Sequence, residues 1–377
     1  MVYLDNAATS RFKPQSVVHA VVTELKNAAN PGRGAHGASI RAAANVMEAR
    51  DSVRMLIHNP SAEVIFTKNC TEALNVAIFG ALKDGGHAVA TVNEHNSALR
   101  PLHELERLGK IRLTILPPSR DGAVNPDDVG RAIKPDTRLV CVNHISNVTG
   151  AKADIDEIAK ITAKNAVIFL VDAAQSLGHV DIDMKKTGID LIAAAGHKGL
   201  HGPQGTGFLA FNGRIKLKPL IIGGTGTASD SVYQPSAPPE AFESGTVNTP
   251  GICGLSEGIK WTVKNAAEIR ARIESLTREL IGGLSSIRNV ALYTPPSALN
   301  GVVAFNIKNM TSSEVGDLLN EKYDIAVRTG LHCAPLVHRA LGTLKSGAVR
   351  ASVGYNNDIK DIKKLLSAVS ETALLRQ

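Results

Sequence analysis

The sequence predicts an α/β protein with a large domain built on a mostly parallel sheet and a smaller α+β domain towards the C-terminal end. Over residues 64–211, short apolar runs typical of buried strands alternate with segments long enough to form helical crossovers. From residue 290 on, strands again alternate with helices. A chain of 377 residues has room for both domains. We expect an N-terminal arm over residues 1–15, a large domain over 16–255 and a small domain, with its linking helix, over 256–377.

The composition is that of a globular enzyme and excludes several other classes of protein. Hydrophobic residues make up 44% of the chain and charged residues 20%. The net charge of +7 is spread out without a basic run, so we expect no nucleic-acid partner. The chain shows no apolar run of membrane-spanning length and no signal-peptide pattern, so we expect a cytoplasmic protein without a membrane partner. No metal site is predicted, because the four cysteines lack zinc spacing.

The elements of the large domain follow from apolar periodicity. Pro14 suits the start of a helix over residues 16–29, and a second helix follows over 40–58. Buried strands are predicted at residues 64–67, 88–92, 112–116, 139–142, 167–171, 191–194 and 207–211. Helices are predicted between them, ending at residue 82 and covering 98–108, 126–133 and 155–164.

The second half of the chain is less regular. Residues 228–240 are rich in Ser and Pro, which predicts a mobile surface loop. Residues 252–284 read as mostly helical and as the link between the domains. In the small domain we expect strands at 302–307 and 349–352 and helices at 314–323 and 359–375.

A lysine and an aspartate follow two of the predicted strands. Lys198 lies in a glycine-rich loop between the strands at 191–194 and 207–211, and Asp172 ends the strand at 167–171. Carboxyl ends of parallel strands are where open α/β sheets bind ligands. A desolvated lysine amine forms Schiff bases with carbonyl groups, and an aspartate pairs with a pyridinium nitrogen. These are the two groups that pyridoxal phosphate requires of a protein.

The strand at 64–67 leads through Cys70 and Thr71 into a helix. A helix N-terminus offers free amides and the positive end of the helix dipole to a phosphate group. We therefore expect the cofactor phosphate beside Cys70 and Thr71. The alternative is that Thr71 is only the N-cap of the helix.

Several motifs occur together in one order along the chain. They are Tyr3-Leu4-Asp5-Asn6-Ala7-Ala8, Val171-Asp172-Ala173-Ala174-Gln175, Gly196-His197-Lys198, Gly202-Pro203 and Arg350-Ala351-Ser352. In this respect the chain resembles the class V aminotransferase family of fold-type I pyridoxal-phosphate enzymes, and within it the cysteine desulfurase and selenocysteine lyase branch. The resemblance implies pyridoxal 5'-phosphate as the cofactor and a fold-type I transferase fold.

The resemblance also implies roles for individual residues. His95 matches the histidine that stacks over the pyridine ring and handles protons, and Asn147 matches the residue that bonds the phenolic oxygen of the cofactor. Gln175 belongs to the cofactor-binding motif. The pair Gly245-Thr246 matches residues that reach the phosphate of the neighbouring subunit, which implies a homodimer with shared sites. His36 matches a histidine at the substrate entrance, or is a loop histidine without a role.

A second reactive group is implied in the segment Arg328-Thr329-Gly330-Leu331-His332-Cys333-Ala334. It resembles the loop in which cysteine desulfurases carry a persulfide-forming cysteine, here Cys333. Arg328 and His332 nearby are expected to provide electropositive surroundings that favour the thiolate. Arg328 and Arg350 match arginines at the carboxylate end of the substrate, with Arg350 as the main clamp.

The chain departs from the family in two places. Ala195 stands where a serine hydroxyl usually binds the phosphate, so His197 and the turn at Cys70 and Thr71 must contribute more. The cysteine loop also carries an additional histidine, His338.

The expected reaction is desulfuration of L-cysteine to L-alanine with formation of a persulfide on Cys333. A sulfur-acceptor protein would then take the outer sulfur of this persulfide. Three alternatives remain at this point. They are selenocysteine lyase, another class V reaction such as transamination or epimerisation, and a non-catalytic scaffold that binds partners.

Overall fold

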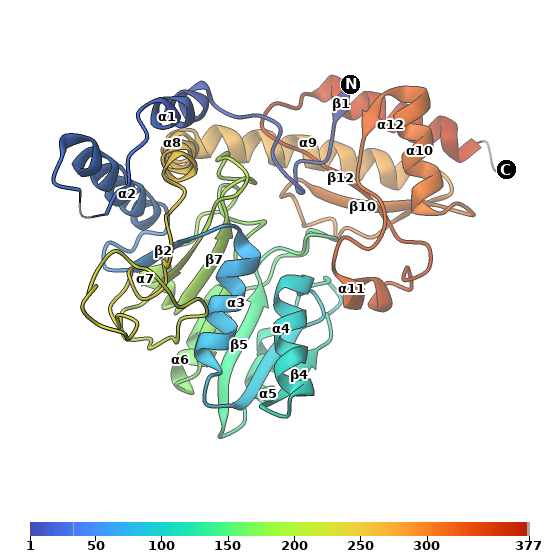
Figure 1. Ribbon diagram of the computed structural model, residues 1–377. Coiled ribbons are helices and arrows are strands. Elements are labelled where there is room, and N and C mark those ends of the chain that lie inside the picture. The colour runs from blue at the N-terminus through green and yellow to red at the C-terminus, as the bar shows by residue number, and fades with distance from the viewer. Residues whose placement is uncertain (33, 375–377) are drawn as a thin grey trace.

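The computed structural model describes residues 1–32 and 34–374. These residues form a large sheet covered by helices and a smaller antiparallel sheet beside it, with a long pair of helices running between the two regions (Figure 1). The N-terminus and residue 374 both lie at the small sheet (Figure 1). The predicted α/β architecture is confirmed.

The large sheet has seven strands among the described residues, in the order β2-β8-β7-β6-β5-β3-β4. Their bounds are β2 Glu63–Thr67, β3 Gly86–Thr91, β4 Ile111–Leu116, β5 Thr137–Asn143, β6 Ile168–Asp172, β7 Leu191–Ala195 and β8 Gly207–Phe211. Strands β4, β3, β5, β6 and β7 pair in parallel, whereas β8 runs antiparallel to both β7 and β2. The predicted mostly parallel sheet is therefore correct, with one reversed strand, β8, next to the edge strand β2. Lys198 lies in the turn between the antiparallel strands β7 and β8.

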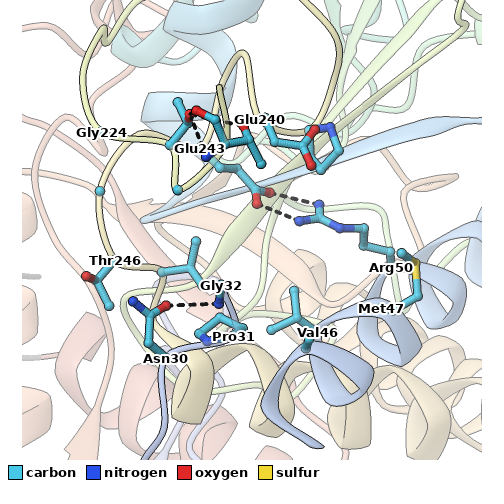
Figure 2. Close-up of a pocket in the computed structure, with 17 residues that line it drawn as sticks. Asn30, Pro31, Gly32, Val46, Met47, Arg50, Gly224, Glu240, Glu243 and Thr246 are labelled. Carbon is cyan, nitrogen blue, oxygen red and sulfur yellow. Dashed lines mark hydrogen bonds and ion pairs between the residues drawn. The ribbon is translucent and has the colours of Figure 1, made fainter. Parts of the chain in front are cut away.

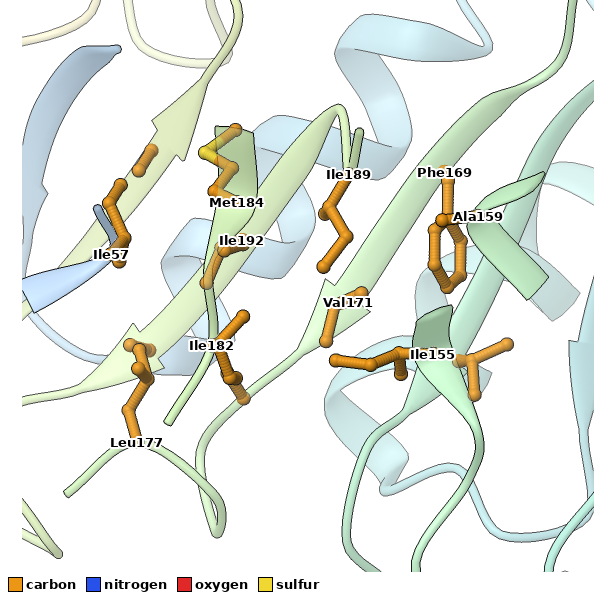
Figure 3. Packing of buried hydrophobic residues seen from close by; sticks show 14 of the residues in the cluster. Ile57, Ile155, Ala159, Phe169, Val171, Leu177, Ile182, Met184, Ile189 and Ile192 are labelled. Atoms are coloured by element: carbon orange, nitrogen blue, oxygen red, sulfur yellow. The ribbon is translucent and has the colours of Figure 1, made fainter. Parts of the chain in front are cut away.

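The central strands β6, β7 and β8 are almost wholly apolar because helices cover both faces of the sheet. One face packs against α3 (Cys70–Ala81) and α4 (Asn96–Arg107), and the other against α5 (Pro126–Ala132), α6 (Ile155–Lys164) and α7 (Met184–Thr187). Figure 3 shows the second face, where Phe169 and Val171 of β6 lie beside Ile155 and Ala159 of α6. This two-sided burial keeps the strand ends, and the groups that follow them, in fixed positions.

Helices α1 (Gln15–Lys26), α2 (Gly37–Leu56) and α8 (Thr249–Lys264) pack together at the edge of the large sheet (Figure 1). Helix α8 ends at its C-cap residue, Asn265, and a second helix, α9 (Ala266–Ser286), begins directly after it and packs against the small sheet. Residues 252–284 are thus mostly helical, as expected, and belong to two helices. The predicted domain boundary at 255/256 falls inside α8 and stays a prediction.

The small sheet has the order β12-β10-β9, formed by β9 Val290–Leu292, β10 Val302–Ile307 and β12 Val349–Ser352. Helices α9, α10 (Ser312–Tyr323) and α12 (Ile359–Leu374) share one hydrophobic core with it. The arm contributes β1 (Val2–Tyr3), which pairs in parallel with β11 (Ile325–Ala326). A short helix, α11 (Pro335–Ala340), follows the cysteine loop.

Most predicted elements are present with ends shifted by one to three residues, and β8, α6, β10 and β12 have the predicted bounds. The sequence did not reveal β1, β9, β11, α7 or α11, which span six residues or fewer and lack a measurable period. Residue 375, the expected end of the last helix, lies outside the described residues. The segment 228–240 lies on the surface, with Val232 93% exposed. Among the described helices, none combines the length and apolarity needed to span a bilayer.

Candidate active site

Lys198 lies where the sequence places it, in the turn between β7 and β8. The turn packs tightly on its neighbours, since a Cβ on Gly199 would collide with the Leu177 carbonyl oxygen. Burial lowers the pKa of the Lys198 amine, and the charges of Arg350 and Arg328 lower it further, against the opposing effect of Asp172. A larger fraction of the amine is therefore unprotonated at neutral pH, as a nucleophilic lysine requires.

The N-terminal arm fixes the backbone beside this lysine. The carbonyl oxygen of His197 accepts hydrogen bonds from the Ser10 amide at 3.1 Å and from the Lys13 ammonium at 3.1 Å, and the Thr9 and Ser10 hydroxyls also donate to it. Gln175 donates to the carbonyl of Ala7 at 2.9 Å and so holds the same arm at the end of β6. In this structure the Gln175 side chain therefore binds the arm.

Asp172 ends β6 and is buried. Its Oδ1 accepts the Ala174 amide at 2.9 Å and faces the Cys70 thiol at 3.5 Å. Burial raises the pKa of Cys70, and the Asp172 charge raises it further, so the thiol stays protonated and donates to the carboxylate. The second carboxylate oxygen has no hydrogen-bond donor within the described chain, which leaves it available to a ligand.

The start of α3 lies beside the start of α4. Asn69 is the N-cap of α3, with its side chain accepting the Glu72 amide at 3.0 Å, so the capping alternative for Thr71 is wrong. The Thr71 hydroxyl contacts the Ser97 hydroxyl at 2.8 Å, and Ser97 in turn contacts His95 Nδ1 at 2.7 Å. Thr71 and His95 are therefore joined through Ser97, and the first amides of α3 have no acceptor inside the helix.

The charges of Asp172 and Lys198 act on the imidazole of His95. Burial lowers the pKa of His95, Asp172 opposes that shift, and the charges of Lys198, Arg100 and Arg328 add to it. His95 is therefore neutral at physiological pH, and its Nδ1 accepts the Ser97 amide at 3.1 Å. A neutral imidazole can present a ring face without adding charge.

Arg350 is buried on β12, and its guanidinium is already partly used. One nitrogen donates to Asp5 of the arm at 2.8 Å, and another donates to the carbonyl of Asn147 at 3.0 Å. Its Nε has no acceptor among the described residues. Arg328 pairs with Arg350 through two backbone hydrogen bonds of 3.1 and 2.7 Å. The small sheet thus brings both predicted arginines together.

The cysteine loop reaches the large sheet through its backbone. The Asn147 side chain donates to the His332 carbonyl at 2.7 Å, and the Asn96 amide donates to the Cys333 carbonyl at 2.7 Å. His332 and Cys333 both have left-handed backbones, with φ of 50° and 56°. The result is that Cys333 is exposed as a free thiol whereas His332 is buried.

The expectation that His332 makes this loop electropositive is wrong. Burial, followed by the charges of Arg350 and His338, lowers the pKa of His332 to about 3. The imidazole is therefore neutral at physiological pH, because a buried cation beside an arginine is unfavourable. Arg328, which is exposed on the same loop, carries the positive charge.

Thr246 belongs to a second group, at a cavity of about 710 Å³ whose lining, over the described residues, includes neither Lys198 nor Asp172. Figure 2 shows Glu243 bonded to Arg50 of α2 at this cavity, whose lining also includes Thr246 and Gly32. The Arg50–Glu243 pair is buried at 2.5 Å and holds the segment 239–247 against α2. His36 is exposed and serves as the N-cap of α2.

Buried polar atoms without partners test whether pyridoxal phosphate fits the Lys198 group. Over the described chain, Asn147 Oδ1, His197 Nδ1 and Arg350 Nε are buried without a hydrogen-bond partner. Burial, Lys198 and Lys13 lower the pKa of His197 to about 4, so its ring is a neutral hydrogen-bonding group. Unpaired buried polar groups are costly in a finished core. With the amides at the start of α3 and the free oxygen of Asp172, they match a ligand that carries a phosphate and a pyridine ring.

Sequence reasoning missed several residues that build this site. Asp5 pairs with Arg350, Ser97 links Thr71 to His95, and Lys13 binds the His197 carbonyl. Asp5 stood within a recognised motif, which was the available signal. Ser97 and Lys13 had none, because Thr71 is distant from Ser97 in sequence and His197 is distant from Lys13.

The comparisons with known proteins agree with this geometry. The model of the family "Aminotransferase class-V" matches residues 2–365, and the chain belongs to that family. A "Probable cysteine desulfurase" of Methanothermobacter thermautotrophicus is 37% identical, with 99% of this chain and 94% of the relative covered. A "Cysteine desulfurase" of Yersinia pseudotuberculosis is 32% identical, with 98% and 92% covered. The apo structure of a cysteine desulfurase from Thermococcus onnurineus has a TM-score of 0.91 at 33% identity, over 99% of this chain and 94% of that one.

Within the family the chain falls in the cysteine desulfurase branch. Enzymes of the family use pyridoxal 5'-phosphate, so this chain is a pyridoxal-phosphate enzyme. In this chain Lys198 would carry the cofactor and Asp172 would face its ring nitrogen.

Proposed function

We propose that this chain removes sulfur from L-cysteine, releasing L-alanine and leaving a persulfide on Cys333. The observation that carries the proposal is the meeting of two reactive groups from distant parts of the chain. Lys198 and Asp172 lie at the edge of the large sheet, and the Cys333 loop is bonded to the same edge through Asn147 and Asn96. A scaffold that only binds partners would have no need of this arrangement.

Bound pyridoxal phosphate supplies an electron sink for the bonds at Cα of the substrate. Asp172 would keep the ring nitrogen protonated, with its carboxylate oriented by the Ala174 amide and the Cys70 thiol. His95 would cover the ring, Asn147 would bond the phenolic oxygen, and the start of α3 with Thr71 and His197 would hold the phosphate. Gln175 supports the site by holding the arm.

The remaining steps belong to side chains. Arg350, with Arg328, holds the substrate carboxylate, and the Lys198 amine takes the proton from Cα. Cys333 as thiolate attacks the substrate sulfur, so an S–S bond forms while the C–S bond breaks. One of the two thiol hydrogens ends on Cβ, and cysteine plus enzyme thiol thus becomes alanine plus enzyme persulfide. Because Cys333 is exposed, the persulfide sulfur is open to an acceptor protein.

The site is completed by a second copy of the chain. Thr246 lies at the separate cavity beside α2, and a homodimer would bring it, with Gly245, to the phosphate of the partner subunit. His36 at the start of α2 would then lie near the substrate entrance. A cytoplasmic location remains a prediction from the sequence.

A product assay tests the function. The protein is purified with pyridoxal phosphate and given L-cysteine or L-selenocysteine, and alanine with sulfide or selenide is measured. Alanine and sulfide from cysteine support the proposal. Turnover of selenocysteine alone would make the protein a selenocysteine lyase, and pyruvate or an epimerised product would assign it another class V reaction.

A further inference from the structure

His338, the histidine that follows the cysteine loop, takes part in a buried hydrogen-bond chain. Its Nδ1 lies 2.8 Å from the Thr343 hydroxyl, and its Nε2 lies 3.3 Å from Nδ1 of His332. The two imidazole rings stack with 5.5 Å between centroids and 19° between planes. All three side chains are at most 5% exposed, so solvent does not compete for these bonds.

The contacts of Thr343 fix the direction of this chain. The Thr343 hydroxyl reaches the His338 carbonyl only at 3.5 Å, and that carbonyl already accepts the Thr343 amide at 2.8 Å. The Thr343 hydroxyl therefore donates its hydrogen bond to His338 Nδ1, which acts as the acceptor. A neutral imidazole carries one hydrogen, so His338 then donates from Nε2 to His332 Nδ1. His332 must in turn carry its own hydrogen on Nε2.

Nε2 of His332 is a buried nitrogen without a hydrogen-bond partner anywhere in residues 1–32 and 34–374. The Arg328 carbonyl lies close enough to His332 to raise its pKa by weak hydrogen bonding. That carbonyl already accepts the Arg350 amide at 2.7 Å, and it does not meet the geometry of a full hydrogen bond with Nε2. A buried donor left unpaired is unfavourable, so the site favours a ligand that brings an acceptor.

A second unpaired buried donor is Nε of Arg350, whose charge acts on His332 and lowers the pKa of that imidazole. Asn147 connects the two residues, because its side chain donates to the His332 carbonyl and its own carbonyl accepts from Arg350. Two buried donors without acceptors, on residues that are bonded to the same asparagine, match the two oxygens of a carboxylate.

We propose that His332 donates its Nε2 hydrogen to the α-carboxylate of the substrate beside Arg350, and that His338 and Thr343 fix the hydrogen on that nitrogen. The inference rests on the proposed desulfuration of an amino acid. His332 is a substrate-binding residue in this account, and His338 and Thr343 are positioning residues that act through it.

Nuclear magnetic resonance of the cofactor-loaded protein, labelled with ¹⁵N in its histidines, tests the hydrogen position. The His332 signals are assigned by their loss in His332→Gln. We expect Nε2 to carry the hydrogen and its resonance to shift with L-alanine but not with L-alaninamide, which lacks the carboxylate. A hydrogen on Nδ1, or equal shifts with both compounds, overturns the proposal.

Kinetics of paired variants test the same idea through the substrate. His338→Leu and Thr343→Val should raise KM for L-cysteine about tenfold with a smaller change in kcat, as for loss of one bond to a charged group. His338→Gln keeps a donor towards His332 and should recover much of that loss. Thr372→Val, which removes an equally buried hydroxyl from α12, should leave KM unchanged.

The outcomes of the two tests can be separated. If KM is the same in His338→Leu and wild type, the positioning role is wrong even though desulfuration continues. If no alanine forms from cysteine in the wild type, the proposed function fails, while the comparison of L-alanine with L-alaninamide still decides whether His332 recognises a carboxylate.

Discussion

The two reactive groups of this protein are held in opposite ways. Lys198 lies in a turn between paired strands, with the neighbouring His197 carbonyl bound by residues of the arm. Cys333 lies exposed on a loop with consecutive left-handed residues. Two hydrogen bonds to the carbonyls of this loop hold it, one from the Asn147 side chain and one from the Asn96 amide. Proton transfer at Cα needs a fixed amine, whereas a sulfur that is passed on needs an accessible carrier. The difference in packing therefore matches the division of the proposed reaction.

The largest effect on activity is expected from a substitution of Lys198, the reactive group that is held between paired strands. Lys198→Ala removes the amine that binds the cofactor covalently, and the purified protein should lose the reducible link and all measurable turnover. Reduction with borohydride followed by mass spectrometry of the wild type should place the label on Lys198. Lys164→Ala, which changes a lysine at the end of α6, is the control and should keep the yellow colour. A native protein free of pyridoxal would contradict this assignment.

The exposed group should behave differently. Cys333→Ser removes the sulfur acceptor but leaves the cofactor site intact, so the protein should stay yellow while cysteine desulfuration falls by ~10²–10⁴. Selenocysteine turnover should fall less, because the C–Se bond is weaker. Cys253→Ser, at a buried thiol between helices, is the matched control. Wild-type desulfuration by Cys333→Ser would show that Cys333 is not the acceptor.

A buried carboxyl group shortly after β3, that of Glu94, should make the free energy of unfolding depend on pH. Glu94 is fully buried, and burial raises its pKa from 4.5 to about 8, against hydrogen bonds from Thr91 and Asn143. Below pH 4.5 the group is neutral in both states. As the pH rises to about 8 the unfolded chain loses the proton first, so the free energy of unfolding falls, by roughly 3–5 kcal/mol.

Glu94→Gln should remove that fall, so its free energy of unfolding relative to wild type should increase between pH 5 and pH 8. Urea unfolding at the two pH values measures the difference. Glu104→Gln, at a half-exposed carboxylate of α4 that pairs with Arg107, should show no such gain. An equal wild-type-to-variant difference at both pH values would mean that Glu94 is ionised in the folded protein.

A smaller effect is expected at Thr246, which lines a separate cavity and, within one subunit, belongs to neither the Lys198 group nor the Cys333 loop. Thr246→Ala should weaken retention of pyridoxal phosphate several-fold, as expected for loss of one hydrogen bond to a charged group. Dialysis and absorbance measure this. Mixed dimers of Lys198→Ala and Thr246→Ala subunits should regain one intact site. An active monomer in sedimentation would rule out the shared site.

The sequence alone determined the α/β class and the principal strands, because continuous apolar runs and helix-length periods are local properties of the chain. It also placed Lys198 in its turn and Asp172 at a strand end, since both positions follow from the strands beside them. The motif of the cysteine loop could also be recognised from the sequence, because its residues are neighbours in the chain.

Only the tertiary structure decided which groups meet and in which charge state. The pairing of Arg350 with Asp5 and the link from Thr71 through Ser97 to His95 join positions that are distant in the chain. The neutral state of His332 depends on burial beside Arg350, and the protonation of Glu94 depends on helices that cover the sheet. Burial and distance set a pKa, and neither is a property of a residue and its neighbours in sequence.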